Sequence, residues 1–266
     1  MGSRWALVTN HQIPTYDKAF GYRANWHHIP IPLLHLYLHN DTDGDGGVSS
    51  MDWRSIVYPV MGFFRRKRLA QFLQLYPDLK NYSVLDVGGR PFIWNLLKEH
   101  YNISPKQLVL LNTPDETMLP ESDDYTVKIA DGRELPYEDK SFDLVFSNSV
   151  IEHVGTLEDM ERFSRECERV GKHFYIQTPN HWFPLEPHLG VAFLHWLPRT
   201  LYRKLCVISI RYPFTINNPS ERKHFYRSFD TTYLLTHKQL RLLFPHQRIL
   251  AEKVLCMVKS VVVSNS

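Results

Sequence analysis

From Ser83 onward, short apolar runs of strand length alternate with stretches in which apolar residues recur at helical spacing. The runs are the segments 83–87, 107–111, 125–129, 142–147 and 173–177. Apolar strands separated by helical segments are typical of βαβ units, in which the strands are parallel. The pattern predicts an α/β fold built on a mostly parallel sheet.

Two helices and a hairpin are predicted from local signals outside these runs. Thr156 and Asp159 form a capping box at the start of one helix, and Gly171 is placed to end it. A second helix is expected from about Thr236 to Phe244, before a proline. The tail, 249–257 followed closely by 259–263, predicts a terminal antiparallel hairpin.

The organisation of the chain is uneven outside this pattern. Residues 1–50 contain three prolines, many histidines and the acidic, glycine-rich stretch 41–47, and are expected to form an N-terminal extension. Residues 51–266 are expected to form the main domain. Within it, the segment 181–229 is rich in proline and aromatic residues and is too long for an ordinary connection. We expect this segment to be a cap on the substrate side of the domain.

Composition and charge limit the choice of class. Lys and Arg number 31 against 28 Asp and Glu, so the net charge of +3 does not favour a nucleic-acid partner. The basic run 65–68 is interpreted as a solvated helix face, with phosphate or anionic lipid as the alternative. Three widely spaced cysteines, and the absence of a secretory signal or of about 18 consecutive apolar residues, favour a cytoplasmic protein.

An acid and two glycines follow the first predicted strand, in the sequence Asp86-Val87-Gly88-Gly89-Arg90. In parallel α/β sheets ligands bind at the carboxyl ends of the strands, and glycine lets the backbone approach a ligand closely. The segment lacks the third glycine of the dinucleotide-binding pattern, so a nicotinamide cofactor is not favoured. An ordinary strand-to-helix turn could use the same residues.

An ordered series of motifs makes this interpretation more specific. The sequence reads Leu-Asp-Val-Gly at 85–88, Asp-Gly-Arg-Glu-Leu-Pro at 131–136, Ser-Phe-Asp at 141–143 and Glu-His-Val at 152–154. This series resembles the class I methyltransferases that depend on S-adenosylmethionine (SAM), particularly the small-molecule enzymes of the type 11 group. The resemblance covers about residues 83–180. It implies a Rossmann-like, seven-stranded, mostly parallel sheet with an antiparallel last strand and helices on both faces.

By this resemblance, four residues near the first two strands would contact SAM. Asp86 and Gly88 would line the methionine part, with Gly89 in the adjoining loop. A carboxylate can pair with the α-ammonium, and amides near a helix start favour the carboxylate; the alternative is that Asp86 caps a loop. Asn112 stands where the family has an acid that accepts both ribose hydroxyls, and it can accept one hydrogen bond and donate another.

Three further residues are assigned to the cofactor site in the same way. Asp131 and Gly132 match the position at the adenine edge, where a carboxylate accepts from the exocyclic amine. A polar turn after a strand is the alternative. Ser147 leaves the fourth strand, where family members bring the acceptor and the sulfonium together.

Candidate catalytic residues follow in the chain. His153 could be a general base, because histidine titrates near neutral pH, or it could pack against the cofactor. Glu186 and His188, next to Trp182 and Phe183, offer titratable groups and stacking surface for an acceptor. A rigid, proline-braced cap is the alternative interpretation of this segment.

Two features lie outside the methyltransferase pattern. Asp41, Asp43, Asp45 and Asp52 match the spacing of an EF-hand calcium loop, except that aspartate replaces the final glutamate. A flexible acidic linker is the alternative. Residues 194–205 mix large apolar with basic side chains and could form an interfacial helix that contacts a membrane, or could pack within the cap.

The sequence therefore predicts an enzyme that transfers a methyl group from SAM to an oxygen or nitrogen of a small-molecule acceptor. The competing hypothesis is an inactive, methyltransferase-like binding or scaffold protein. The identity of the acceptor and the oligomeric state are not predicted.

Overall fold

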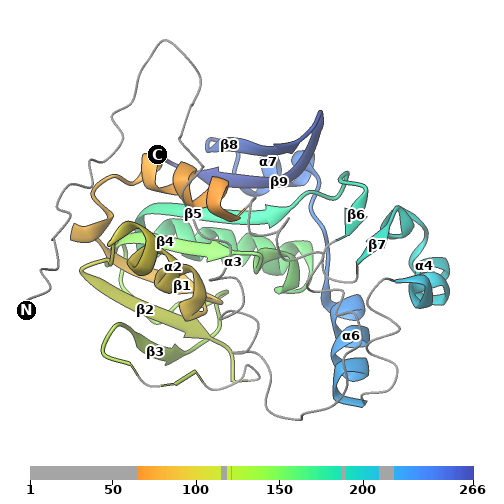
Figure 1. The fold of residues 1–266 in the computed structure, drawn as a ribbon, viewed down its shortest axis with the longest axis horizontal. Helices are drawn as coiled ribbons and strands as arrows, with labels where there is room; N and C mark the ends of the chain where they lie inside the picture. Colours follow the sequence, from red (N-terminus) through yellow and green to blue (C-terminus); the bar gives the residue numbers. More distant parts are fainter. Residues whose placement is uncertain (1–64, 115–118, 121, 187–189, 210–218) are drawn as a thin grey trace, which may run out of the picture. The chain divides into compact units, whose positions relative to one another are not determined.

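A seven-stranded sheet forms the centre of the computed structural model, which describes residues 65–114, 119, 120, 122–186, 190–209 and 219–266 (Figure 1). The strand order is β3-β2-β1-β4-β5-β9-β8. The strands are β1 (Ser83–Val87), β2 (Gln107–Asn112), β3 (Thr126–Ile129), β4 (Phe142–Asn148), β5 (Gly171–Pro179), β8 (Arg248–Val254) and β9 (Met257–Ser264). Strands β1 to β5 are parallel, and β9 is antiparallel to both β5 and β8. The predicted parallel sheet with an antiparallel last strand is confirmed.

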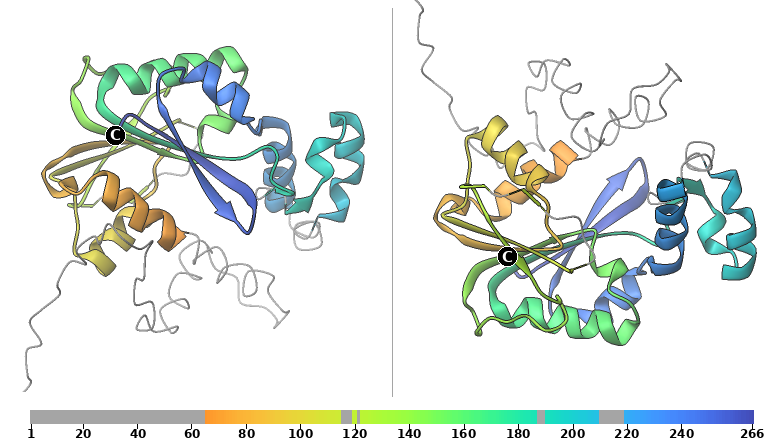
Figure 2. Two further views of the ribbon diagram at one scale, coloured as in Figure 1. Left: turned by 90° about the horizontal axis from the view of Figure 1, so that it is seen from above. Right: turned by 90° about the horizontal axis from the view of Figure 1, so that it is seen from below.

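Helices cover both faces of this sheet (Figure 2). On one face, the helix at residues 65–75 and α2 (Pro91–Tyr101) bury Phe72 and Trp94 against the sheet. On the other face, α3 (Leu157–Val170) and α7 (His237–Leu243) bury Phe163 and Leu240. Successive strand residues point to opposite faces, so each central strand contributes to both cores. The sheet is therefore buried on both sides, as its continuous apolar runs require.

The predicted helix signals are confirmed at α3 and α7. The Thr156 hydroxyl accepts a hydrogen bond from the Asp159 amide, and the Asp159 carboxylate accepts one from the Thr156 amide. Gly171 follows the last turn as the C-cap. At α7, Thr236 and Gln239 form a second capping box. These reciprocal bonds satisfy amides that the first turn of a helix leaves without partners.

The terminal hairpin inserts its second strand into the sheet. Strand β9 lies between β5 and β8, and Leu255 adopts φ 54° in the short connection between β8 and β9. Residues 261–263 of β9 are buried, whereas β8 forms the edge of the sheet. The hairpin places Glu252 and Ser260 opposite each other, level with the carboxyl end of β5.

The segment after β5 forms a smaller unit with its own core, which extends two residues beyond the range 181–229 predicted as a cap. It contains β6 (Leu185–Glu186), β7 (Val191–Ala192), the 3-10 helices η5 (Leu194–Trp196) and η6 (Cys206–Ile208), α4 (Arg199–Leu205) and α6 (Pro219–Thr231). Val191, Phe225 and Phe229 are buried together, and the Tyr202 ring lies 4.7 Å from that of Phe229. No helix in the described part of the chain is long and apolar enough to cross a membrane.

Candidate functional site

The predicted cofactor residues meet at the carboxyl edge of the sheet. Asp86 lies in β1, Asn112 ends β2, and Ser147 lies near the end of β4. Asp131 follows β3. These strands are hydrogen-bonded neighbours that run in the same direction, so residues near their carboxyl ends share one edge. The structure thus brings together side chains that are up to 61 positions apart in the numbering of the chain, from Asp86 to Ser147.

The loop after β1 leaves no room for a side chain at Gly88 or at Gly89. Gly88 has φ +73°, and a Cβ added there would lie 2.5 Å from Cγ2 of Val150. At Gly89 an added Cβ would lie 2.1 Å from Cγ of Asp86. Gly88 also donates its amide to the carbonyl of Leu111 in β2. Glycine is required here both for the backbone conformation and for the close approach to Asp86.

Asp86 is a buried carboxylate with one polar contact from a side chain. It is 2% exposed, and Nε1 of Trp94 in α2 donates to its Oδ2 at 2.7 Å. Burial raises the pKa of Asp86 to about 7, and the bond from Trp94 opposes that rise. No cationic side chain in the described part of the chain pairs with it. A buried carboxylate without a cation fits a site that receives a positively charged ligand group.

Asn112 contacts the glycine loop. Its Nδ2 donates to the carbonyl of Gly89 at 2.9 Å, and its side chain is buried. This bond connects the end of β2 to the loop after β1. The amide group of Asn112 thus keeps its oxygen as an acceptor, while its nitrogen fixes the shape of the loop.

Asp131 lies at the surface and is already bonded to a cation. Its two carboxylate oxygens accept from Nε and Nη2 of Arg133, and Arg133 also pairs with Asp159 in α3. The Arg133 hydrogen bonds hold the pKa of Asp131 below its usual range. Next to it, an added Cβ at Gly132 would lie 2.9 Å from both Phe163 and Val87. Glycine at 132 is therefore required by packing in the core.

Ser147 points into the sheet. Its side chain is fully buried, and its hydroxyl donates to the carbonyl of Val87 at 3.1 Å. The hydroxyl thus cross-links β4 to β1 directly beneath the glycine loop. A role of Ser147 at the cofactor would use its position in the strand, because its hydroxyl already has an acceptor.

The candidate catalytic residues lie beyond β4 and β5. His153 ends the 3-10 helix η4 (Ile151–His153) and is half-buried, with Nδ1 3.3 Å from the Thr232 hydroxyl. The adjacent Glu152 is fully buried and accepts from the Thr178 hydroxyl at 2.9 Å. Glu186 is buried in β6, within the segment predicted as a cap. His188, and the acidic loop with Asp41, Asp43, Asp45 and Asp52, lie outside the described residues.

A polar network at the same edge was not found from the sequence. Arg68 of the 65–75 helix donates to Asn148 at 2.8 Å, to Gln177 at 3.0 Å and to Glu252 at 2.8 Å. The hydroxyl of Ser260 also donates to Glu252. The interpretation of the basic run 65–68 as a solvated helix face is wrong for Arg68, whose side chain is 15% exposed. A basic run carries no signal of which member turns inward.

Ser149, at the same edge of the sheet, has an unusual backbone conformation. It adopts φ 57°, donates its amide to the carbonyl of Gln177 and donates its hydroxyl to Oε1 of Gln177. Non-glycine residues with positive φ are uncommon and often lie at functional sites. The strained turn directs the chain from β4 into η4, where Glu152 and His153 lie.

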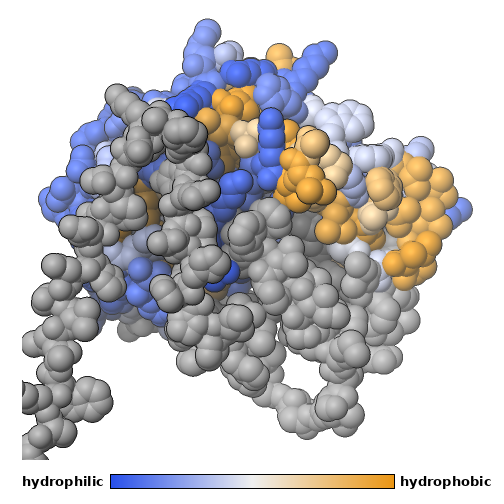
Figure 3. All heavy atoms as spheres, turned by 45° about the horizontal axis from the view of Figure 1, so that its top comes forward, coloured by the Kyte–Doolittle hydropathy of each residue, from blue (hydrophilic) through white to orange (hydrophobic). Residues whose placement is uncertain are grey.

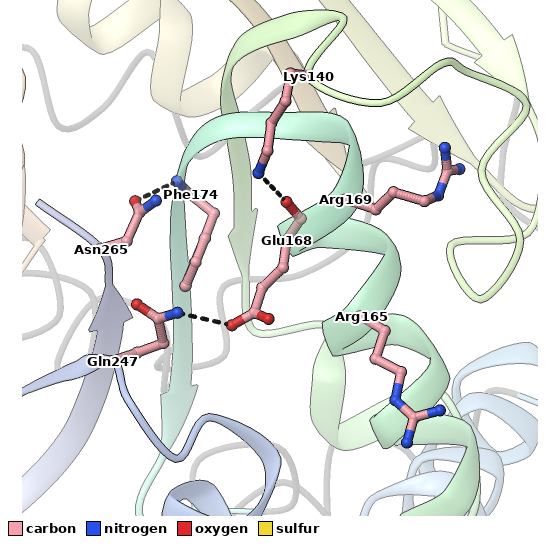
Figure 4. Close-up of a pocket in the computed structure, with 7 residues that line it drawn as sticks. All are labelled: Lys140, Arg165, Glu168, Arg169, Phe174, Gln247 and Asn265. Atoms are coloured by element: carbon pink, nitrogen blue, oxygen red, sulfur yellow. Dashed lines mark hydrogen bonds between the residues drawn. The ribbon is translucent and has the colours of Figure 1, made fainter.

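Two hollows lie at opposite edges of the sheet. One of about 100 Å³ lies beside Arg68, Phe92, Phe146, Asn148 and Tyr175, close to the predicted site. The other lies at the amino edge, where the Glu168 carboxylate accepts from Gln247 at 3.0 Å and its carbonyl accepts from Lys140 at 2.6 Å (Figure 4). None of the predicted site residues lines this second hollow.

Comparison with known proteins identifies a domain family. Residues 98–173 match the model of a methyltransferase domain. No curated protein matches the chain.

Solved structures with a similar chain trace come from several archaea and bacteria. One is a protein from Pyrococcus horikoshii OT3, with 20% identity over 81% of this chain and 91% of the other, and a TM-score of 0.44. A SAM-dependent methyltransferase from Aquifex aeolicus has 15% identity over 75% of this chain and 87% of the other, and a TM-score of 0.42. A SAM-dependent methyltransferase from Archaeoglobus fulgidus has 12% identity over 75% of this chain and 93% of the other, and a TM-score of 0.46.

The seven-stranded sheet with its antiparallel last strand is the sheet that the resemblance implied, and the matched residues run from α2 to the start of β5. Residues 98–173 thus match a methyltransferase domain, and the acid and the two glycines after β1 lie at the expected edge of the sheet. The predicted fold is confirmed, and the match of residues 98–173 agrees with the predicted methyl transfer.

Proposed function

We propose that this enzyme methylates an oxygen or nitrogen of a small-molecule acceptor, and that Asp86 anchors the methyl donor. The observation that carries the proposal is the buried carboxylate of Asp86 beside the glycine loop, with Trp94 as its hydrogen-bond donor. A cationic ligand group that pairs with this carboxylate would offset the cost of its burial. The ammonium and sulfonium of SAM are such groups.

The residues around Asp86 hold the donor in this proposal. SAM supplies an activated methyl group on its sulfonium. Gly88 and Gly89 let the loop pack closely against Val150 and Asp86, and Asn112 keeps the loop in shape through its bond to the Gly89 carbonyl. The Asn112 oxygen is available to accept from a ribose hydroxyl. Asp131 would accept from the adenine amine in addition to its bonds from Arg133.

The acceptor side is assigned to η4 and the cap. Because a methyl sulfonium is already reactive, holding the acceptor atom in line at roughly 3–3.5 Å provides most of the rate enhancement. His153 takes the acceptor proton where the acceptor is protonated, and Thr232 orients its ring through Nδ1. Glu186 and His188 contribute polar groups from the cap.

The proposal is tested by calorimetric titration of SAM into the full chain and into Asp86→Asn. The substituted amide would keep an acceptor for the Trp94 indole but would lose the charge, so we expect SAM affinity to fall about tenfold or more, as for a charge-assisted hydrogen bond. Asp124→Asn is the matched control, because Asp124 is an exposed carboxylate paired with Lys98 at the amino side of β3. Equal affinity of Asp86→Asn and the unchanged protein would contradict the role of Asp86.

The acceptor class has a separate test. Protein incubated with methyl-labelled SAM and a cell extract should label compounds that pass a small-pore membrane, and alkali and acid stability of the label separates oxygen esters from amines. Label found only in protein or nucleic acid would overturn the small-molecule acceptor.

Two further proposals rest on the sequence alone. Calcium binding by residues 41–52 is proposed from the spacing of the aspartates and is tested by calcium titration of the chain and of Asp45→Asn. A cytoplasmic location is proposed from the cysteine content and is tested by cell fractionation.

A further inference from the structure

Large apolar side chains are exposed together on the cap. Trp182 is 61% exposed and Phe193 is 56% exposed, and Trp196 and Leu185 are also exposed. The ring of Trp196 lies 6.2 Å from that of Trp182 and 5.4 Å from that of Phe193, so the three rings form one cluster. We call these four residues the aromatic cap surface.

The aromatic cap surface continues into α4 and η6. Leu201, Val207 and Ile208 are exposed, the last at 69%, and α4 packs beside both η5 and η6. Figure 3 shows apolar side chains gathered on one side of the molecule. Single exposed apolar residues are ordinary, but a contiguous set of this kind marks an interaction surface.

The backbone of Phe193 is strained, and its ring is exposed to solvent. Phe193 adopts φ 62° and ψ −18°, a left-handed conformation that is unfavourable for a bulky side chain. Its amide donates to the carbonyl of Pro184 at 2.7 Å, which fixes the turn. The strain does not bury the ring, which stays more than half exposed. Strain that keeps an aromatic side chain in solvent favours a role for that side chain in binding.

The indole of Trp196 has a hydrogen-bonded N–H and a partly exposed apolar ring. Its Nε1 donates to the carbonyl of His181 at 2.8 Å, while the residue is 40% exposed. Tryptophan with a satisfied N–H and an exposed apolar ring is typical of membrane interfaces.

Basic side chains adjoin the apolar ones on α4. Arg199, Arg203 and Lys204 are exposed, and Glu186 is the only acidic residue of the sequence between 181 and 209. Glu186 is buried, so it does not offset this charge at the surface. Arg199 donates to the carbonyls of Phe229 and Asp230, which fixes α4 against the end of α6. Arg203 pairs with the exposed Asp230 of α6, so Arg199 and Lys204 carry the net positive charge beside the aromatic rings.

We propose that the aromatic cap surface attaches the protein peripherally to a bilayer that contains anionic lipids. Aromatic and aliphatic side chains would enter the headgroup region, and the basic residues of α4 would lie near lipid phosphates. A second copy of the chain fits less well, because a two-fold contact through this surface would bring the basic residues of both copies together. The inference does not depend on the identity of the methyl acceptor.

Sedimentation of the full-length protein with vesicles tests the inference. Vesicles of phosphatidylcholine alone are compared with vesicles that also contain phosphatidylserine. We expect binding to the anionic vesicles, a loss of roughly tenfold in affinity for Phe193→Asn or Trp182→Ser, and a loss of at least about fivefold for Lys204→Glu. Asparagine tolerates the left-handed conformation, so Phe193→Asn is expected to fold.

Two variants control for general effects of charge and apolar area. Leu242→Ser removes a side chain that is 67% exposed on α7, and Lys106→Glu reverses an exposed charge just before β2. Both should bind vesicles as the unchanged protein does. Absence of binding to anionic vesicles, or equal losses for the control variants, would overturn the inference. So would a concentration-dependent dimer, seen by analytical ultracentrifugation, that Phe193→Asn abolishes, because the surface would then bind a second copy.

Discussion

The indole nitrogen of Trp94 donates a 2.7 Å hydrogen bond to the carboxylate of Asp86 in the interior of the protein. Trp94 lies in the first turn of α2 and Asp86 lies in β1, so the bond spans the glycine loop between them. It fixes the carboxylate at the carboxyl edge of the sheet while leaving its charge without a cation in the described part of the chain. The stability of the protein should therefore depend on pH through Asp86, and the protonation of Asp86 should change when SAM binds.

The stability of the protein should depend on pH through Asp86. Burial raises the pKa of Asp86 to about 7 in the folded state, from 3.8 for an unperturbed side chain. The folded state then binds more protons than the unfolded state between those values, so the contribution of Asp86 to stability is present below pH 4 and is lost as the pH rises to about 7. Thermal unfolding of the protein and of Asp86→Asn should show a difference that grows across this range, up to about 4 kcal/mol. A difference that does not change with pH would contradict the raised pKa.

Binding of SAM should release a proton below neutral pH. A cationic group beside Asp86 favours the ionised carboxylate, so the pKa falls on binding and the proton leaves. Calorimetry at about pH 6 in two buffers of different ionisation enthalpy measures the number of protons released. We expect roughly 0.5–1 proton for the unchanged protein and none from this site in Asp86→Asn. The same value for both proteins would show that the proton comes from another group.

Gly89→Ala should disrupt the loop after β1. The new Cβ would lie 2.1 Å from Cγ of Asp86, and this contact is with a buried group that Trp94 holds in place. We expect a loss of at least about 2 kcal/mol in the free energy of unfolding and a clear fall in SAM affinity. Asn95→Ala, an exposed change on α2, is the control. Unchanged unfolding and SAM binding in Gly89→Ala would show that the loop can adjust.

The contributions of Arg68 and Glu252 to the free energy of unfolding should be strongly coupled. Their 2.8 Å ion pair joins the 65–75 helix to β8, and the Glu252 side chain is 4% exposed. Burial alone would raise the pKa of Glu252, but Arg68 and the Ser260 hydroxyl lower it, and the net pKa lies below the usual range. Glu252→Gln leaves the Arg68 charge buried without its partner and should cost about 3–5 kcal/mol.

Denaturant unfolding of Arg68→Met, Glu252→Gln and the double variant measures this coupling. We expect the double variant to lose less than the sum of the two single losses by about 1–3 kcal/mol. Because the pKa of Glu252 is depressed, the contribution of the pair is present at neutral pH and is lost as the pH falls through that pKa. Strictly additive losses would mean that the pair contributes little beyond its separate contacts.

His153→Gln should slow methyl transfer without weakening the binding of SAM. General bases contribute roughly 10²–10⁴-fold, so transfer of labelled methyl groups at saturating SAM should fall by about that factor. Thr232→Val, which removes the contact to Nδ1, should cause a smaller loss. A normal rate with His153→Gln would assign His153 to packing, and a parallel loss of SAM affinity would assign it to the cofactor site.

Most of the fold could be predicted from local sequence patterns. The five parallel strands, the capping box of α3, helix α7 and the terminal hairpin lie where the patterns predicted them, with ends that differ by a few residues. Strands buried on both faces need continuous apolar runs, and helix starts need residues that satisfy free amides. Gly88 and Gly89 could be assigned to a close loop because few other residues fit there.

The contacts of the site side chains were not predictable in the same way. Asn112 binds the Gly89 carbonyl, Ser147 binds the Val87 carbonyl, and Asp131 is paired with Arg133. In each case the residue type permits several partners, and neighbouring elements decide which one is used. The residue type thus indicated that each of these residues lies in the site, but not which hydrogen bonds its side chain forms.

The sequence by itself determined the order of the five parallel strands along the chain, the helices α3 and α7, the terminal hairpin and the edge of the sheet at which the candidate site lies. These properties follow from spacing along the chain, from capping and from the conformational freedom of glycine. Only the tertiary structure decided that Trp94 binds Asp86, that Arg68 turns inward to Glu252, 184 positions away, and that Phe193 faces solvent. Such contacts join residues whose separation in the chain carries no pattern, so they are set by packing between elements.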